Sequence, residues 1–168
     1  DTLSKLILAS NKYGDNNIYG PKILNFFDGR IWYAGGKLNP YTFSANNIGI
    51  NKTNLLTEYK TGKTDFVSGC SLFIKKDILN QIGGFNKIYK FYYEDVDLCL
   101  KAKLFNVNSI FVNNSVVKHK ISYSMGGRYS IFKLYLKLVS KMKFIFSNNS
   151  FFKSIFYLFI NILLLPFN

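Results

Sequence analysis

Acidic side chains gather at one point of this sequence, directly after an aromatic run. Glu94, Asp95 and Asp97 follow Phe91-Tyr92-Tyr93 and precede apolar residues at helical spacing. We therefore expect a helix to begin near residue 94, with the carboxylates in its first turn, where the helix dipole favours negative charge. Carboxylates in this position usually act only as caps and dipole partners. One that projects from a helix start into a cleft is also suited to general-base chemistry.

Histidine and cysteine are scarce in the chain. The single histidine, His119, ends an apolar run that predicts a strand, so its imidazole is expected at a strand end. A lone histidine before a basic residue is more often a surface group than a functional one. Cys70 and Cys99 are too few for a disulfide scaffold and lack metal-ligand spacing, which favours reduced, buried thiols in a cytoplasmic setting.

Short elements of mixed type must position these side chains. Asp1 or Ser4 is expected to cap an opening helix, and Asp28-Gly29 has the turn chemistry of a hairpin between residues 21–27 and 30–34. The polar stretch 35–63 predicts a long loop. The further expected elements are a strand over 65–74 with Cys70, Leu72 and Ile74 on one face, a helix capped by Asp77 and ended by Gly83-Gly84, and strands over 109–112 and 116–119.

The C-terminal tail has a different character from the rest of the chain. Residues 129–146 have the pattern of a basic amphipathic helix, because Lys133, Lys137 and Lys141 recur every four residues opposite an apolar face. We expect this lysine stripe to bind an anionic membrane surface, and a merely solvated face is the plainer alternative. Residues 147–168 predict an apolar, membrane-associated segment. Its apolar run is slightly shorter than the ~20 residues of a spanning helix, so spanning and in-plane insertion both stay open.

The composition limits the class of protein. A chain of 168 residues with 48% apolar content forms one domain with a core and is not disordered. The net charge of +13 requires a negative partner, which is a nucleic acid, a lipid surface or a phosphorylated substrate. We expect no nucleic-acid partner, because no binding motif is present and the basic residues are thinly spread outside the tail.

Several short segments occur in an order that is typical of one enzyme family. They are Ile-Trp-Tyr-Ala-Gly-Gly at 31–36, Val-Ser-Gly-Cys at 67–70, Leu-Phe-Ile-Lys-Lys at 72–76, Ile-Gly-Gly-Phe at 82–85, Phe-Tyr-Tyr-Glu-Asp-Val-Asp-Leu-Cys-Leu-Lys at 91–101, Val-Val-Lys-His-Lys at 116–120 and Ser-Tyr-Ser-Met-Gly-Gly at 122–127. Together they resemble the family-2 glycosyltransferases, especially the rhamnosyltransferase-like members that build cell-surface polysaccharides. The likeness extends over about residues 1–145.

The resemblance implies a fold and a reaction. The fold is an α/β domain of the GT-A (Rossmann-like) type with a mixed sheet, of which residues 1–128 form the acceptor-side half. The reaction is inverting transfer of a sugar from a nucleotide-sugar donor to a glycan or lipid-linked acceptor, with Mg²⁺ or Mn²⁺, at the cytoplasmic face of the membrane. The family's metal-binding Asp-x-Asp is expected upstream of Asp1-Thr2-Leu3, so this chain alone is expected to be inactive.

The resemblance also implies roles for individual residues. It assigns the general base to Asp95 and makes Glu94 a partner that contacts the acceptor or orients the base. His119 is implied in the metal or diphosphate site. Residues implied in substrate binding are Trp32, Gly36, Gly69, Tyr92, Tyr93 and Asp97, where Asp97 is expected to be mainly supportive and the aromatic residues are alternatively core.

Two functions other than an enzyme remain open from the sequence. One is a non-catalytic remnant that folds but performs no chemistry. The other is a basic module that binds a membrane surface or a nucleic acid through its positive charge.

Overall fold

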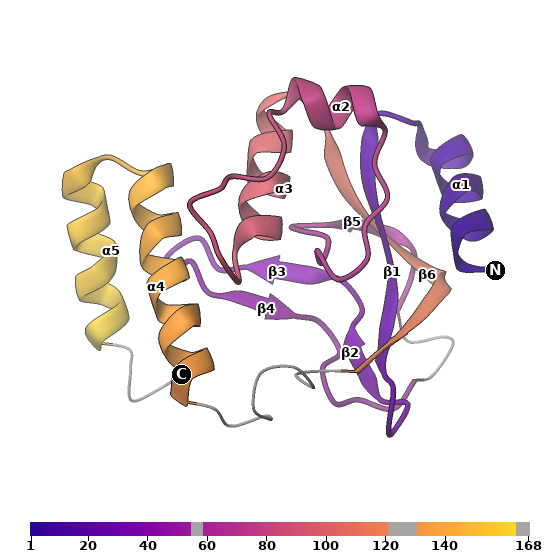
Figure 1. Cartoon of the computed structure of the whole chain (residues 1–168), viewed down its shortest axis with the longest axis horizontal. Coiled ribbons are helices and arrows are strands. Elements are labelled where there is room, and N and C mark those ends of the chain that lie inside the picture. The colour runs from indigo at the N-terminus through magenta and orange to yellow at the C-terminus, as the bar shows by residue number, and fades with distance from the viewer. Residues whose placement is uncertain (55–58, 121–130, 164–168) are drawn as a thin grey trace.

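The computed structural model describes residues 1–54, 59–120 and 131–163 (Figure 1). The resemblance segment at 122–127 and the last five residues of the expected apolar segment, 164–168, lie outside this part of the chain. Helices and strands alternate irregularly along the chain, and the expectation of a mixed α/β fold is confirmed.

A four-stranded sheet of order β2-β1-β6-β5 forms the centre of the molecule (Figure 1). The long strands β1 (Asn17–Asn25) and β6 (Asn108–His119) run parallel to each other. The short strands β2 (Ile31–Tyr33) and β5 (Gly62–Thr64) pair antiparallel with them at the two edges. The sheet is therefore mixed, as predicted.

The two strands expected over 109–112 and 116–119 are one continuous strand. Val112 pairs with Pro21 and Val116 pairs with Lys22, so residues 113–115 of β6 have no counterpart on β1. Such a bulge absorbs polar residues without ending a strand, because only the extra residues lose their ladder partners. The predicted hairpin at Asp28-Gly29 joins β1 to β2, and Gly29 has a positive φ of 68° that suits the turn.

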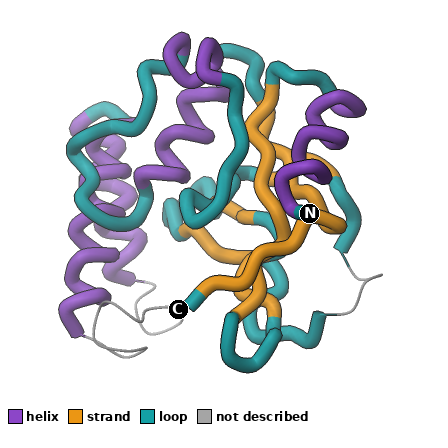
Figure 2. The backbone as a smooth tube through the Cα atoms, turned by 45° about the vertical axis from the view of Figure 1, so that its right-hand side comes forward, coloured by secondary structure: helices purple, strands orange, loops and turns teal. Residues whose placement is uncertain are grey.

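Helices cover both faces of the β1–β6 pair. α1 (Thr2–Tyr13) lies on one face and α3 (Glu94–Leu104) on the other (Figure 2). Successive strand residues alternate between these faces. Ile18 belongs to the larger core against α3, and Tyr19 to the smaller core beneath α1. The expected cap of α1 is present, since Asp1 Oδ1 accepts a hydrogen bond from the Ser4 amide at 2.8 Å.

The long loop predicted over residues 35–63 is wrong, because the stretch contains strands. β3 (Gly36–Leu38) and β4 (Ala45–Asn47) form a separate two-stranded hairpin, and β5 follows near the end. Asn39 closes the hairpin loop, where its Oδ1 accepts hydrogen bonds from the Tyr41 and Thr42 amides. Side chains of this type replace missing backbone partners, so a polar sequence can still turn sharply.

The strand predicted over residues 65–74 is also wrong. Phe66 and Phe73 form only isolated bridges, and the Ser71 amide bonds to the Ser68 carbonyl in a tight turn between them. The turn leaves Cys70 exposed rather than buried with its apolar neighbours. A long-range contact to α3, described below, stabilises this turn, and such a contact has no signature in local sequence.

The short helix that follows is α2 (Lys76–Gln81). Lys75 rather than Asp77 occupies its N-cap position, so the predicted cap lies two residues too far along the chain. Gly83 and Gly84 end the helix as predicted, with positive φ angles of 79° and 66°.

Two C-terminal helices, α4 (Ile131–Asn148) and α5 (Phe151–Leu163), pack side by side at one end of the molecule (Figure 1). Phe144 of α4 enters the main core, where its ring lies 5.3 Å from that of Tyr93 and 5.9 Å from that of Phe43. Within the described residues, no helix is sufficiently long and apolar to cross a bilayer.

Candidate active site

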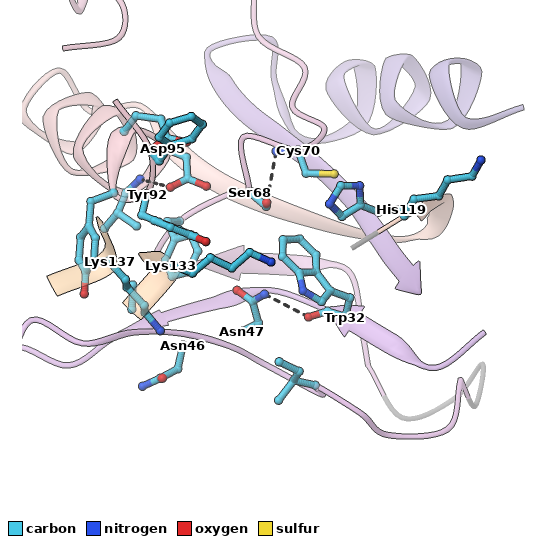
Figure 3. A pocket seen from close by; sticks show the side chains of 18 residues that line it. Trp32, Asn46, Asn47, Ser68, Cys70, Tyr92, Asp95, His119, Lys133 and Lys137 are labelled. Atoms are coloured by element: carbon cyan, nitrogen blue, oxygen red, sulfur yellow. Dashed lines mark hydrogen bonds between the residues drawn. The ribbon is translucent and has the colours of Figure 1, made fainter. Parts of the chain in front are cut away.

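A cavity of about 540 Å³ opens beside the start of α3 (Figure 3). Its walls come from β2, β4, residues 66–70, the start of α3, the end of β6 and the N-terminal part of α4. Because β1 and β6 are parallel, their carboxyl ends meet at one edge of the sheet, which is where α/β proteins usually bind ligands. The cavity therefore lies where the fold alone favours a site.

The backbone is strained immediately before α3. Tyr92 and Tyr93 have φ angles of 63° and 69°, and no side chain caps the helix at Tyr93. Left-handed backbone at non-glycine residues costs roughly 1–2 kcal/mol per residue and is concentrated at functional sites. The two residues turn the chain sharply, so that α3 begins at the cavity wall with Glu94 and Asp95.

Asp95 is held in place by backbone amides from two elements. Its Oδ2 accepts a hydrogen bond from the Gly69 amide at 2.8 Å, and its Oδ1 accepts one from the Val96 amide at 2.8 Å. Burial raises the pKa of Asp95, and the hydrogen bonds from these amides lower it by less. The result is an oriented carboxylate that binds a proton more readily than an ordinary aspartate.

Glu94 stands next to Asp95 with one oxygen unused. Among the described residues, no group hydrogen-bonds to its buried Oε2. Burial raises the pKa of Glu94, and the negative charge of Asp95 raises it further. Buried acceptors are normally satisfied, so this oxygen is suited to accept a hydrogen bond from a bound ligand.

The wall of the cavity away from Asp95 is aromatic (Figure 3). His119 ends β6, as predicted, and its ring meets the edge of Trp32 at a centroid distance of 5.3 Å (Figure 3). Lys133 and Lys137 of α4 line the cavity on the same side as Asp95 and Tyr92 (Figure 3), whereas the Lys120 ammonium lies over the Phe26 ring at 4.9 Å. The cavity thus contains both carboxylates and lysine side chains.

The predicted amphipathic helix is present as α4, and the lysine stripe includes an inward-facing residue that was not expected. The lysine stripe was assigned to a membrane surface, whereas Lys133 is only 8% exposed and lines the cavity. The apolar face is the exposed one, with Ile131 85% and Leu134 60% accessible. Ser140 and Phe144 explain the difference, because they continue the lysine face and are buried against the rest of the domain.

Three of the predicted substrate-binding residues have structural contacts instead. A Cβ on Gly36 would lie 2.5 Å from the Phe66 ring, so this glycine permits close packing. Gly69 orients Asp95 through its amide. Asp97 is buried away from the cavity, where Oδ1 accepts from the Tyr89 hydroxyl and Asn148 and Oδ2 pairs with Lys101 at 3.2 Å.

The two tyrosines differ in their surroundings. Tyr92 lines the cavity and is partly exposed. Tyr93 reaches the cavity wall but is 3% exposed, and its hydroxyl donates to the Phe43 carbonyl at 2.9 Å, so its contacts are mostly those of a core residue. Burial raises the pKa of Tyr93 to about 12, which keeps the phenol protonated.

Several cavity residues were missed by the sequence prediction. Ser68, Cys70, Asn46 and Asn47 line the cavity, and Asn47 Nδ2 donates to the Trp32 carbonyl at 3.1 Å. Ser68 and Cys70 flank Gly69 in a segment of the resemblance, whereas nothing in the local pattern of Asn46 and Asn47 indicates a site. The α4 lysines share a helical face with the apolar residue Phe144. This was the feature of the sequence that could have indicated that the face is buried.

The described residues do not assemble a site for Mg²⁺ or Mn²⁺. Within this part of the chain, no three His, Cys, Asp or Glu side chains gather closely enough to hold a metal ion. Both oxygens of Asp95 already accept amide hydrogens, and His119 packs against Trp32. The donor set around the cavity therefore does not fit a metal held by these residues alone.

Comparison of the sequence with models of known protein families finds no match. Comparison with curated proteins finds no match either. The resemblance to family-2 glycosyltransferases and the GT-A assignment therefore stay predictions.

Proposed function

We propose that residues 1–128 form the acceptor-side half of an inverting glycosyltransferase of the GT-A type, which moves a sugar from a nucleotide-sugar donor to a glycan or lipid-linked acceptor. The observation that supports this most is the Asp95 carboxylate. The Gly69 and Val96 amides fix it at the wall of the cavity, and burial raises its pKa. Inverting transfer needs one oriented base, and this carboxylate has the properties of one.

In the proposed reaction Asp95 takes the proton of the acceptor hydroxyl. As the proton leaves, the acceptor oxygen forms a bond to the anomeric carbon of the donor sugar. The bond from that carbon to the diphosphate oxygen breaks, and its electron pair leaves with the diphosphate, so the configuration inverts. The raised pKa makes the carboxylate a stronger base than an exposed aspartate.

Other residues of the cavity position the substrates. The unused Oε2 of Glu94 accepts a hydrogen bond from an acceptor hydroxyl, and Trp32 and Tyr92 offer aromatic faces to sugar rings. The resemblance implies Mg²⁺ or Mn²⁺ for the diphosphate. Such an ion would require ligands beyond the described residues, and His119, which lines the cavity, is the residue that the resemblance assigns to it.

The proposal includes a membrane surface at the cytoplasmic side. Apolar side chains of α4 and α5 that are at least 46% exposed include Ile131, Leu134, Leu138, Met142, Ile155, Phe156, Phe159 and Ile162. An exposed apolar face of two neighbouring helices is suited to lie in the interfacial layer of a bilayer. In this arrangement the other face of α4 lines the cavity, so a lipid-linked acceptor would reach Asp95 from the membrane.

The proposal is tested by acceptor-dependent release of nucleoside diphosphate from nucleotide sugars, with polyprenyl-linked and free glycans as acceptors. The assay uses the natural polypeptide that contains residues 1–168, with whatever flanking residues it has. We expect release that requires both substrates and is lost in Asp95→Asn. A folded protein that releases no nucleoside diphosphate with any donor, or releases it equally well after Asp95→Asn, would contradict the proposal.

A further inference from the structure

The loop of the β3–β4 hairpin, residues 39–44, contacts both C-terminal helices. The ring of Phe43 packs against Phe144 of α4 at a centroid distance of 5.9 Å, and against Tyr157 of α5 at 4.7 Å. Both pairs are close to edge-on, which is a favoured arrangement of aromatic rings. The hairpin loop is therefore anchored on the two helices by one aromatic side chain.

A polar contact beside this ring has the same partners. The ammonium of Lys141 on α4 donates to Ser44 Oγ of the hairpin loop at 2.9 Å and to Asn161 Oδ1 of α5. One lysine thus joins the loop to α4 and α5 together. Because Lys141 is partly buried, its hydrogen bonds are less exposed to competition from water.

A third contact connects the hairpin loop to the start of α3. The hydroxyl of Tyr93 donates to the Phe43 carbonyl at 2.9 Å, and the Tyr93 ring lies 5.3 Å from that of Phe144. Tyr93 is the N-cap residue of α3, directly before Glu94 and Asp95. The hairpin loop is therefore bound to the residue from which the helix with both carboxylates begins.

The backbone on both sides of this hydrogen bond is left-handed. The φ angle is 54° at Phe43, 63° at Tyr92 and 69° at Tyr93. Residues other than glycine keep this conformation only where the surrounding structure holds them in it. Among the described residues, no side chain caps α3 at Tyr93. The contact with the hairpin loop is thus a long-range means of fixing a helix start that has no local cap.

We propose that Tyr93 is a positioning residue for Asp95, because its hydroxyl ties the strained start of α3 to the β3–β4 loop, which α4 and α5 hold in place. In this role Tyr93 acts through the Asp95 side chain, which the Gly69 amide binds at 2.8 Å, and not through a substrate. The consequence for turnover rests on the proposed function, whereas the effect on the hydrogen bond between Asp95 and Gly69 does not.

The first test observes the Gly69 amide by NMR in the natural polypeptide that contains residues 1–168. Its proton bonds to Asp95 Oδ2, so its chemical shift should follow the protonation of that carboxylate and its exchange with solvent should be slowed. Tyr93→Phe keeps the ring and removes the hydroxyl. We expect it to accelerate Gly69 exchange about three- to tenfold, as for loss of one hydrogen bond, and to reduce the pH-dependent change in shift.

Tyr19→Phe is the matched control. The hydroxyl of Tyr19 also donates to a backbone carbonyl, that of Gly14, but it lies in the smaller core beneath α1 on the other face of the sheet. Tyr19 and Tyr93 are both buried, so the two variants should lose similar stability in urea denaturation. We expect only Tyr93→Phe to alter the Gly69 amide. Equal changes at Gly69 in the two folded variants would overturn the proposal.

The link to the C-terminal helices is tested separately. Lys141→Met keeps the apolar stem of the side chain and removes the ammonium that holds Ser44 and Asn161. It should change the Gly69 amide in the same direction as Tyr93→Phe and by less, whereas Lys153→Met, at an exposed lysine of α5, should not change it. A Gly69 amide that is identical in wild type and Lys141→Met would contradict the role of α4 and α5, and this pair decides the proposal if Tyr93→Phe does not fold.

Kinetics distinguish positioning from substrate binding. In the transfer assay Tyr93→Phe should lower kcat about three- to tenfold and change the KM values of donor and acceptor less than about twofold, because no substrate contact is removed. A loss confined to KM would overturn the proposal, since Tyr93 would then bind a substrate directly. The Gly69 measurements need no turnover, so failure of the transferase proposal and failure of the positioning role give different results.

Discussion

The start of α3 and the lysine face of α4 both line one cavity, yet they depend on the sequence in different ways. At α3, the carboxylates sit in the first turn, where local sequence already placed them, and a single long-range amide from Gly69 orients Asp95. At α4, the helix was predicted but its orientation was not, because burial of Ser140 and Phe144 turns the lysines inward. A helix start is a local feature, whereas the choice of a buried face is a property of the whole fold.

The largest expected effect tests the α3 wall. Asp95→Asn keeps the shape of the side chain and removes its basicity, so turnover by the natural enzyme should fall about 10²–10⁴-fold with donor affinity nearly unchanged. Glu94→Gln should be milder, because that residue is proposed to hold the acceptor rather than accept its proton. Steady-state kinetics and donor titrations measure both. Near-normal turnover by folded Asp95→Asn would transfer the role of base to Glu94.

Asp97 connects the two helices, since it lies in the first turn of α3 and accepts a hydrogen bond from Asn148 at the end of α4. Asp97→Ala leaves Tyr89, Asn148 and Lys101 without this buried acceptor, and should lower the free energy of unfolding by about 3 kcal/mol. Asp77→Ala, in the exposed first turn of α2, is the control and should change it by less than about 0.5 kcal/mol. Urea denaturation compares them, and equal midpoints for the two variants would contradict the structural role.

The two faces of α4 should respond differently to vesicles. Leu134→Asp and Leu138→Asp place charge on the exposed apolar face, and each should weaken binding to anionic vesicles about tenfold or more, as expected from loss of a buried leucine. Lys137→Gln lies on the cavity face and should change vesicle binding less than twofold in the absence of phosphate ligands. Sedimentation with vesicles measures both. The reverse order of effects would restore the lysine stripe as the membrane contact.

The smallest expected effect is a displacement of the pH profile. Because burial raises the folded-state pKa of Asp95 above its ordinary value of 3.8, the base is protonated at a higher pH than an exposed aspartate. The acid limb of kcat/KM should therefore lie above 3.8, with activity lost as the pH falls through that limb. Glu94→Gln removes a neighbouring negative charge and should move the limb to lower pH. An acid limb that Glu94→Gln leaves unchanged would show that the two carboxyls are not coupled.

Local chemistry determined much of this protein in advance. Asp1 caps α1, Asp28-Gly29 turns the β1–β2 hairpin, Gly83-Gly84 ends α2, and the acidic run opens α3, as expected from the sequence. Each of these features depends on residues within a few positions of one another. Short-range geometry and hydrogen bonding are sufficient to specify them.

The tertiary structure decided which residues share the cavity. The polar stretch 35–63 became a hairpin, the apolar stretch 65–74 became a turn held by Asp95, and β6 continued through a bulge because β1 lay beside it. The lysines of α4 entered the cavity because Phe144 of the same face packs on Tyr93 and Phe43. Amphipathic periodicity defines two faces of a helix, but only the packing of the surrounding core determines which of them is buried.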